Sequence, residues 1–398
     1  MQSRRFTLAV VCAATAMLML DIAVVNTALG SIAADLHTGL SGLQWVVDAY
    51  TLALAATVLT AGSLADRFGR RRLFTLGLSI FTLASLACTL AGDIAMLNTA
   101  RAVQGTGAAI MFAVSLAILA NAFPETRDRV RALGVYGATI GASFAVGPLV
   151  GGALTSGLGW RWIFAINLPL GLICLAITRW RVEESRDPAA RRVDWAGQAL
   201  LAGGLFVLVL ALLRGNEDGW GSPLIVGCLA AAVLLLAAFV AVERRVAQPM
   251  LPLALFRTGP FTAAQVVAFA ISGSLFAVYL YSTIYLQHVV GLSPVETGLA
   301  YLPGTVICFF VSGATATLGQ RFTPRTLLVL GLGLVATGQA LLTMVSTDST
   351  WLAVEPGMIV AMAGTGLVNP TLSGLALGSV PDSQSGLAAG VNDTFRQA

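Results

Sequence analysis

Three ionisable side chains interrupt long apolar runs of the sequence, where no water is available to solvate a charge. Asp21 lies about midway along the first run, Asp48 about two turns into the second, and Arg101 within the fourth. A charge in the middle of a membrane-spanning helix costs roughly 2.5–3.5 kcal/mol on insertion scales, so such residues indicate a functional site. Asn26 and Gln104 add polar groups one to two turns away along the same helices. The set predicts a central polar cavity in which a carboxylate exchanges a proton for a cationic substrate.

A structural role is the alternative for the same residues. Asp21 and Arg101 could form a static ion pair that only holds two helices together. Asp48 could instead extend toward the membrane surface, as charged side chains near helix ends do. The residues alone leave these alternatives open.

A string of small and charged residues, GSLADRFGRRR, closes the second apolar run at positions 62–72. Its first glycine permits close contact between helices, its aspartate lies at the membrane edge, and its arginines hold the loop on the cytoplasmic side. A simple positive anchor needs only the arginines, so the added glycine, acid and spacing indicate a more specific role. The residues that we single out are Gly62, Asp66, Arg67, Gly69 and Arg70.

The fifth apolar run carries VGPLVGG at positions 146–152, preceded by Gly137 and Gly141. Small residues let two helices approach closely, and a proline inside a helix removes one backbone hydrogen bond and bends the helix. Ordinary helix packing explains isolated glycines, whereas the clustered GP-x-x-GG pattern predicts a hinge or a tight seam. The residues that carry this prediction are Gly147, Pro148, Gly151 and Gly152.

Two further strings receive plainer interpretations. WRWIFAINLPLG, positions 160–171, places aromatic side chains at the start of the sixth run, as expected for a belt at the membrane surface. EESRDPAARRVD, positions 183–194, is interpreted as a solvated linker without a further role. The five cysteines are dispersed singly, and His37 and His288 lack neighbours at metal-ligand spacing, so no metal or cofactor site is expected.

The composition requires that helices in a membrane position these residues. Of the 398 residues, 57% are hydrophobic and 11% are charged, and the mean hydropathy is +0.84. Soluble domains carry about 25% charged residues, so a soluble enzyme, a disordered chain and a nucleic-acid-binding protein are excluded. All 23 basic residues are arginine, which excludes a Walker A lysine and Schiff-base chemistry on lysine. The chain is not expected to be an enzyme.

Apolar runs of about 20 residues or more recur along the chain and predict an all-α polytopic membrane protein. The first run follows Arg4 and Arg5 and is too long for the apolar core of a signal peptide. A thirteenth run begins near Ser385. The twelve spans predicted before it are 6–34, 42–65, 73–92, 95–122, 131–157, 162–180, 195–213, 222–243, 260–287, 296–319, 326–346 and 351–379.

The distribution of arginines sets an orientation. With the N-terminus in the cytoplasm, nineteen of the 23 arginines fall in cytoplasmic loops, and only Arg161 and Arg214 fall in loops on the opposite side. Those opposite loops hold acidic residues instead. Because cytoplasmic loops of membrane proteins carry an excess of arginine and lysine, the sequence predicts a multi-pass protein of the cell membrane with a cytoplasmic N-terminus.

Three short strings recur in the same order at nearly the same distance, which indicates two homologous, pseudo-symmetric halves. The expected parts are an N-terminal six-helix bundle at 1–182, a linker and two-span insert at 183–257, and an incomplete C-terminal bundle at 258–398. A complete second bundle would need about 40–50 more residues, so the sequence is expected to be truncated at its C-terminal end. The repeated pairs are DRFGRRRL (66–73) with QRFTPRTL (320–327), GTG (105–107) with GTG (364–366), and FPE (123–125) with VPD (380–382).

Together these strings resemble the motifs of the fourteen-span drug:proton antiporter branch of the major facilitator superfamily. LDIAVVNTALG at 20–30 is similar to that branch's first-span motif, GSLADRFGRRR to its second–third loop motif, and RAVQGTGAA at 101–109 to its fourth-span motif. VGPLVGG, WRWIFAINLPLG and GLAAGVNDTFRQ at 386–397 are similar to its antiporter, sixth-span and thirteenth-span motifs. The matches follow one another in order along nearly the whole chain.

The resemblance implies a major facilitator fold and a proton-driven exporter that works by alternating access between two bundles. It associates Asp21 and Arg101 with proton coupling and substrate binding, and Asp66, Arg67 and Arg70 with locking the inner gate. The implied energy source is the proton gradient rather than a cofactor. The implied partners are protons, the lipid bilayer and small drug-like molecules, amphipathic and cationic or neutral, with no nucleic acid.

Three residues depart from the motifs of that branch. Gly30 stands where proline is usual, Ser143 where glycine is usual, and Asp393, in place of asparagine, could be an additional acid inside the membrane. Two other functions stay open: a dedicated exporter of one endogenous metabolite, such as an antibiotic or a siderophore, and a non-transporting sensor or scaffold. Participation of a periplasmic adaptor is also left open.

Overall fold

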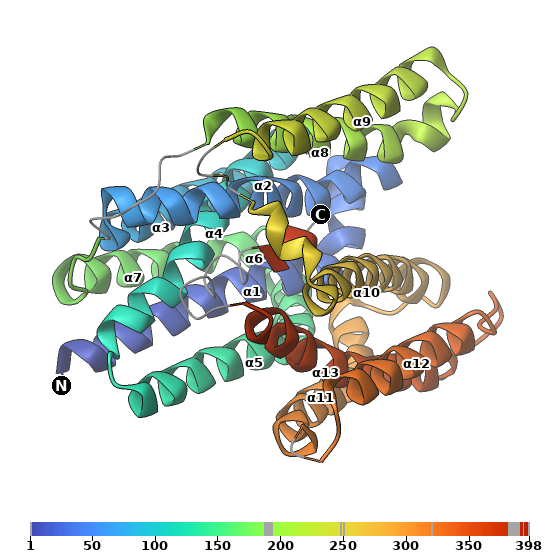
Figure 1. Ribbon diagram of the computed structural model, residues 1–398. Helices are drawn as coiled ribbons and strands as arrows, with labels where there is room; N and C mark the ends of the chain where they lie inside the picture. Colours follow the sequence, from blue (N-terminus) through green and yellow to red (C-terminus); the bar gives the residue numbers. More distant parts are fainter. Residues whose placement is uncertain are drawn as a thin grey trace.

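Helices make up every regular element of the computed structural model (Figure 1). The structure describes residues 2–186, 194–246, 249, 251–319, 321–380, 391–392 and 394–396. No strand occurs among these residues, so the all-α prediction is confirmed for them. Asp393 and most of the predicted thirteenth span lie outside the described residues, and only the short pieces 391–392 and 394–396 of that stretch are seen as helix.

The helices fall into three consecutive groups along the chain. We call the first group the first part: α1 (Gln2–Leu36), α2 (Leu40–Phe68), α3 (Arg70–Thr89), α4 (Ile94–Ala122), α5 (Thr126–Leu158), α6 (Trp162–Ala165) and α7 (Asn167–Arg181). The hairpin consists of α8 (Trp195–Asp218) and α9 (Pro223–Glu243). The second part comprises the 3-10 turn η1 (Leu253–Arg257), α10 (Gly259–Ile284), the π-helical turn η2 (Tyr285–Val289), α11 (Pro294–Leu318), α12 (Pro324–Leu342), the 3-10 turn η3 (Trp351–Ala353) and α13 (Glu355–Gly378).

Each of the twelve predicted spans coincides with one helix or with a broken pair of helices. Within the described residues, ten helices are long and apolar enough to cross a membrane, and the bent helices α2 and α5 raise the number to twelve. The sixth span is interrupted at Ile166, which separates α6 from α7, and the ninth continues into η2. The prediction of a polytopic helical membrane protein is therefore confirmed, with boundaries that shift by a few residues because the helices extend into polar ends.

The ends of these helices follow from the local sequence. Asp93 and Ser222 each accept a hydrogen bond from a backbone N–H in the first turn of the helix that follows. Ser293 and Glu296 form a reciprocal capping box at the start of α11. Gly69 separates α2 from α3 at a φ of +110°, a conformation that residues with a Cβ rarely adopt. The tight connection after α2 therefore depends on this glycine.

Two spanning helices are bent. In α5, the axis turns by 43° between Gly134–Ser143 and Val146–Leu158, close to the position four residues before Pro148, where a proline ring clashes with a backbone carbonyl. In α2, the axis turns by 51° between Leu40–Val58 and Thr60–Phe68, although this helix contains no proline. The bend in α2 therefore has another cause.

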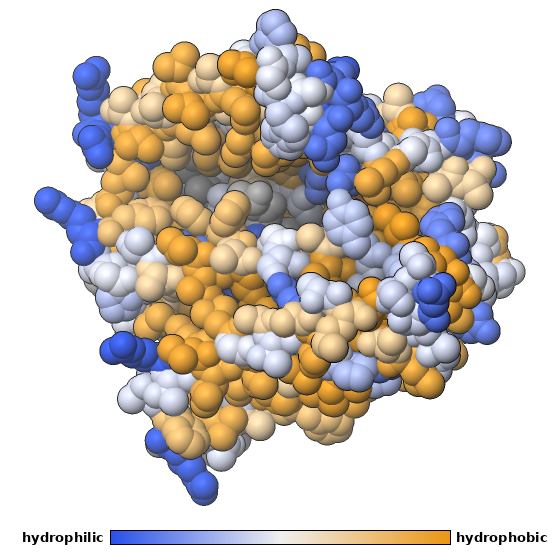
Figure 2. All heavy atoms as spheres, turned by 90° about the vertical axis from the view of Figure 1, so that its right-hand side faces the viewer, coloured by the Kyte–Doolittle hydropathy of each residue, from blue (hydrophilic) through white to orange (hydrophobic). Residues whose placement is uncertain are grey.

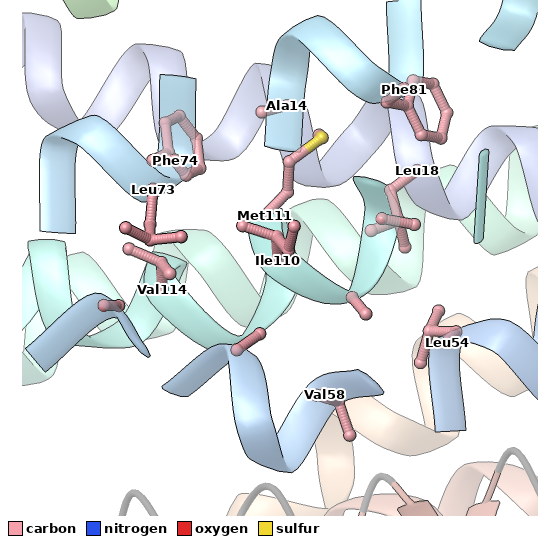
Figure 3. Packing of buried hydrophobic residues seen from close by; sticks show 14 of the residues in the cluster. Ala14, Leu18, Leu54, Val58, Leu73, Phe74, Phe81, Ile110, Met111 and Val114 are labelled. Atoms are coloured by element: carbon pink, nitrogen blue, oxygen red, sulfur yellow. The ribbon is translucent and has the colours of Figure 1, made fainter. Parts of the chain in front are cut away.

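The main core of the first part lies where α1, α2, α3 and α4 meet (Figure 3). Leu18 from α1, Leu54 from α2, Phe81 from α3 and Met111 from α4 are all buried in this core. A Cβ on Gly107 of α4 would lie 2.6 Å from the backbone nitrogen of Phe81, so α3 and α4 touch at the level of the backbone. Packing this tight fixes the position of α4 and of the polar side chains that it carries.

The three groups of helices pack on one another in a definite order. The hairpin lies along α2, at the top of Figure 1, and α10 to α13 lie at the lower right. The first and second parts touch mainly through α5 against α11 and α1 against α10. We call the side of the molecule at which α1 begins the N-side, and the side at which α1 ends the far side.

The outer surface is apolar over most of the face shown in Figure 2. Hydrophobic side chains cover the middle of this face, and the most hydrophilic ones project at its margins. Large apolar side chains are exposed on several helices, among them Leu83, Leu172, Leu234 and Phe310. A soluble protein rarely exposes so much apolar surface, whereas lipid chains solvate it well. The surface is thus that of an integral membrane protein.

Candidate functional site

Asp21 of α1 and Arg101 of α4 form an ion pair inside the first part. Arg101 Nη1 lies 2.5 Å from Asp21 Oδ2, and the two side chains are 2% and 0% exposed. A charge-assisted hydrogen bond of this length between buried side chains is strong. The structure thus joins the two charges that stand out most in the sequence.

Three neutral side chains complete the surroundings of this pair. Gln104 donates from Nε2 to Asp21 Oδ1 (2.8 Å) and to Ser85 Oγ (2.9 Å), and it accepts from Arg101 Nη1 through Oε1 (2.7 Å). Asn167, the first residue of α7, donates from Nδ2 to Asp21 Oδ1 (3.1 Å). The carboxylate of Asp21 therefore accepts hydrogen bonds from three side chains on α4 and α7.

Arg101 also contacts α2 and α6. Its Nε donates to the backbone carbonyl of Val46 on α2 at 3.0 Å. Its guanidinium carbon lies 4.2 Å from the ring centre of Tyr50 and 5.7 Å from that of Phe164, distances typical of cation–π contacts. Arg101 thus connects α1, α2, α4 and α6, so a change at this residue affects the packing of the whole first part.

Helices of the first part enclose the pair, and the central polar cavity stays a prediction. Asn26 does not join the cluster: its amide donates to the carbonyl of Ile22 in its own helix at 3.3 Å. Asp48 is half-buried, and among the described residues no hydrogen bond or ion pair links its carboxylate to Arg101. Helical geometry explains the difference, since Asn26 lies five residues from Asp21, roughly 140° around the helix, whereas Gln104 lies three residues from Arg101 on the same face.

The loop after α2 forms a second polar cluster on the N-side. Arg70 donates from Nε (3.0 Å) and Nη2 (2.8 Å) to Asp66 Oδ1, one turn earlier in the chain. The backbone N–H of Arg70 donates to the carbonyl of Ser185 at 2.8 Å, and that of Arg71 donates to Glu184 Oε1 at 3.0 Å. The loop predicted to be a gate is therefore held by the chain that follows α7.

Glu183, Glu184 and Arg186 are exposed, as expected of a solvated linker, but the contacts of Glu184 correct the interpretation that this stretch has no further role. Glu184 Oε2 lies 3.8 Å from Arg71 Nε and 3.7 Å from Arg72 Nε, and a Cβ on Gly69 would lie 2.7 Å from Glu184 Oε1. The acid lies more than 110 residues from these arginines in the chain, so their contact depends on the fold of the whole first part. Residues 187–193 lie outside the part that the structure describes.

Two other residues of the loop string lack the contacts expected of them. A Cβ on Gly62 would meet no atom within 4 Å, so the close helix contact predicted there is not made. Arg67 is exposed, and its guanidinium carbon lies 5.5 Å from the ring centre of Phe68. Of the string, Arg70, Arg71 and Arg72 contact the segment after α7, whereas Asp66 pairs with Arg70 inside the string.

The predicted seam of α5 packs against α1. A Cβ on Gly147 would collide with the side chain of Ala23, and a Cβ on Gly151 would lie 2.8 Å from the Cα of Val24. Both contacts lie on the turn of α1 that follows Asp21. The glycines thus let α5 reach the helix that carries the buried carboxylate.

The same seam also contacts α11 of the second part. A Cβ on Gly152 would collide with the backbone carbonyl of Pro294, and a Cβ on Gly298 would collide with that of Pro148. A Cβ on Gly137, nearer the N-side, would meet no atom within 4 Å. Close contact between α5 and α11 is therefore concentrated in the half of α5 toward the far side.

Gly30, the departure from proline in the first-span motif, lies at another contact between the two parts. A Cβ there would collide with the side chain of Gln287 in the π-helical turn η2. Gln287 uses the space to donate from Nε2 to the backbone carbonyl of Thr27 at 2.9 Å. The absence of a side chain at Gly30 is what allows this contact between α1 and η2.

The aromatic string at the start of the sixth span is more than a surface belt. Trp160 is buried and donates from Nε1 to Asp35 Oδ2 at 3.0 Å. Arg161 lies 2.6 Å from the same carboxylate oxygen and donates to the carbonyl of Ala91. Of the aromatic side chains in the string, only Trp162 is exposed as a belt residue would be. The string instead fixes the start of α6 and α7, and with it Asn167.

Sequence reasoning missed Ser85, Asn167, Tyr50 and Glu184 as members of the two polar clusters. Asn167 had a detectable signal, because an amide inside an apolar run has the same solvation problem as a charge. Ser85 and Tyr50 had none, since serine and tyrosine are common in membrane helices. Among the described residues, no group of three or more His, Cys, Asp and Glu side chains could hold a metal ion.

The chain is similar to known membrane proteins along almost its whole length. The family described as the Major Facilitator Superfamily matches residues 11–398. The multidrug resistance protein Stp of Mycobacterium tuberculosis (strain CDC 1551 / Oshkosh) is 37% identical over 380 residues, 96% of this chain and 71% of the relative. The puromycin resistance protein pur8 of Streptomyces alboniger is 40% identical over 405 residues, 99% of this chain and 79% of the relative.

Two further similarities agree with these matches. The tetracenomycin C resistance and export protein of Streptomyces glaucescens is 35% identical over 396 residues, 98% of this chain and 73% of the relative. Among solved structures, a D-xylose-proton symporter superimposes with a TM-score of 0.68 over 98% of this chain and 87% of that one, at 15% sequence identity. At this level of identity the structural similarity concerns the fold.

Proposed function

Because this chain belongs to the major facilitator superfamily, we propose that it exports small amphipathic molecules in exchange for protons. Within that superfamily we assign it to the fourteen-span drug:proton antiporters, on the motifs that it shares with them. The relatives named as multidrug, puromycin and tetracenomycin C resistance proteins support drug export as the function. The substrates are cationic or neutral compounds, and the proton gradient supplies the energy.

The buried pair of Asp21 and Arg101 is the observation on which the proton coupling rests. Asp21 accepts hydrogen bonds from Arg101, Gln104 and Asn167 in a site without exposed surface, so a proton on this carboxylate changes contacts to two other helices. A proton that binds Asp21 removes the ion pair and turns one acceptor oxygen into a donor. The helices then separate at lower cost, and the proton leaves when the pair forms again.

The contacts between the two parts support an inward-facing state. With the N-terminus in the cytoplasm of the cell, as the arginine distribution predicts, the far side is the outer side. Gln287 bonds to Thr27 on that side, and Gly152 packs there against Pro294. Release of a compound to the outside requires that these contacts open, which is the alternating-access step of the proposal.

The loop after α2 is the inner gate in this proposal. Asp66 and Arg70 hold its shape, Glu184 binds it to the end of α7, and the glycine seam around Pro148 is the hinge on which α5 moves. The moving bodies are an N-terminal bundle at 1–182 and a C-terminal bundle at 258–398, separated by the insert at 183–257. Asp48 and Asn26 are assigned to substrate binding, outside the buried pair.

Export of a single endogenous metabolite is the second candidate function. Its support is that several relatives carry the name of one antibiotic, among them methylenomycin A and puromycin. Both candidates use the same proton site, so they differ only in the range of substrates. Protection of cells against many unrelated compounds argues for the first candidate, and protection against one compound argues for the second.

Transport by the purified protein in proteoliposomes tests the proposal. The cationic dye ethidium is the probe, and a trapped pH indicator reports proton movement. We expect dye and protons to move in opposite directions, and Asp21→Asn to abolish the proton-driven movement while dye exchange without a gradient remains. Asp218→Asn is the matched control, because Asp218 pairs with Arg214 in an exposed i,i+4 contact. Coupled transport by Asp21→Asn at the wild-type rate would show that the coupling site lies elsewhere.

A further inference from the structure

The hairpin contacts the bent helix α2 through one polar side chain. Gln198, one turn into α8, donates from Nε2 to the backbone carbonyl of Ala56 at 2.8 Å. The hydroxyl of Thr60 donates to Gln198 Oε1. The amide thus binds α2 on both sides of the break between Val58 and Thr60, where the helix axis turns by 51°.

This contact lies at the bend of a helix that contains no proline. A sharp bend weakens the backbone hydrogen bonds around it, and the exposed carbonyls need other donors. Apolar surroundings offer no water for that purpose, so a side chain from a neighbouring helix has to serve. Gln198 donates to Ala56, four residues before Thr60, which is the carbonyl that a straight helix would pair with the N–H of Thr60.

Other contacts keep the hairpin against the first part and connect it to the second. The rings of Trp45 on α2 and Phe206 on α8 lie 6.1 Å apart between their centres. At the end of α9, the buried Glu243 accepts a hydrogen bond from the backbone N–H of Leu251 at 3.0 Å. Leu251 leads directly into η1 and α10. The hairpin is therefore attached to α2 along its length and to the start of the second part at its end.

We propose that Gln198 is a positioning residue for the loop after α2: it holds the bend of this helix and thereby the position of Asp66 and Arg70. The assignment of that loop as the inner gate rests on the proposed function, whereas the control of the bend by Gln198 does not. Beyond the bend, α2 continues for eight residues, roughly 12 Å at 1.5 Å per residue, so a change of about 10° in the bend moves its end by roughly 2 Å.

A distance measurement across the N-side tests this role. Spin labels are attached at Phe68→Cys, at the end of α2, and at Phe322→Cys, the matching position of the sequence repeat, with the five native cysteines replaced. Both positions are exposed. In lipid nanodiscs we expect Gln198→Leu to shift or broaden the distance distribution by roughly 2 Å or more, because α2 loses both hydrogen bonds. Gln339→Leu is the matched control, since it removes a Gln–Ser contact between α12 and α10 and leaves α2 intact.

A second variant separates positioning from simple attachment of the hairpin. Thr60→Val removes one of the two hydrogen bonds, so it should shift the distances in the same direction by a smaller amount. Combined with Gln198→Leu, it should add nothing further, because the two residues act through one contact. For transport of ethidium, Gln198→Leu should lower the turnover number about tenfold while KM changes less than about twofold, since the residue does not touch the substrate.

Unchanged distances in Gln198→Leu overturn the proposal, whatever happens to transport. If this variant does not reach the membrane, an unchanged distribution in Thr60→Val overturns it as well. If the wild-type protein transports nothing, the proposed function fails, while a shifted distribution still supports the role of Gln198 in bending α2.

Discussion

Replacing Asp21 by asparagine is expected to destabilise the protein by about 3–5 kcal/mol, the range for removal of one partner of a buried ion pair. The geometry explains why asparagine is no substitute for the carboxylate. Arg101, Gln104 and Asn167 all donate to Asp21, and an amide offers one oxygen where the carboxylate offers two. Either Arg101 loses its acceptor or the amide N–H group faces another donor. The buried donor that remains without a partner costs about 1–3 kcal/mol, and the uncompensated charge of Arg101 accounts for the rest.

A second substitution distinguishes loss of pairing from loss of packing. Arg101→Gln alone should also be strongly destabilising, because it leaves the carboxylate of Asp21 without its cation. The double variant buries no unpaired charge. Its loss of unfolding free energy should therefore be smaller than the sum of the losses in the two single variants, by about 2–3 kcal/mol. A merely steric role for either residue predicts that the two losses add.

Unfolding in mixed micelles with increasing denaturing detergent, followed by tryptophan fluorescence, measures these free energies. The pair of Arg214 and Asp218 on α8 is the control, because its side chains are 45% and 26% exposed. The same cycle there should give a coupling below about 1 kcal/mol, as exposed pairs do. If the Asp21 and Arg101 losses are additive, or if Asp21→Asn is as stable as wild type, the pair does not contribute the stability that we assign to it.

Two further predictions concern the glycines at contacts between the parts of the molecule. Gly152→Val should lower the free energy of unfolding by about 1–3 kcal/mol and slow ethidium efflux, because the new side chain meets the backbone of Pro294. Gly157→Val, in open space on the same helix, is the control for both measurements. Equal behaviour of the two variants would contradict the reasoning. Gly30→Val should displace Gln287 from its contact with α1, which amide hydrogen exchange detects as faster exchange in η2, and an unchanged exchange rate there would show that the space at Gly30 is not required.

Much of the fold could be predicted from the sequence, because hydropathy alone determines which segments cross a membrane. The twelve spans follow from runs of apolar residues, and each coincides with a helix or a broken pair of helices in the structure. The approach of Asp21 and Arg101 was predictable for a related reason: each needs a partner in an apolar surrounding, and few candidates exist. These inferences depend on local composition, which the sequence states directly.

Contacts between residues distant in the chain were not predictable in the same way. Glu184 reaches the loop after α2 only because α7 ends beside it, and Gln198 reaches α2 only because the hairpin folds back along that helix. The direction in which a side chain points around its helix also decides whether it reaches the buried pair. Asn26 and Gln104 have similar chemistry and similar separation from a charge, yet Gln104 faces the pair and Asn26 does not. The sequence gives the angle between two residues around one helix, but not the position of the partner helix.

In the proposed mechanism, the enclosure of Asp21 within the first part bears on the charge of the molecules that are exported. Thr27, the residue of α1 that bonds to Gln287, lies six residues beyond Asp21, roughly 9 Å along the same rigid helix. A change at the carboxylate can therefore reach the contact between the parts through movement of α1, without a cargo ever touching the acid. Competition of a proton and a cargo for one carboxylate would demand a positive cargo. Transmission along α1 requires no charge on the exported molecule, so the proposed mechanism accommodates an uncharged compound as well as a cation.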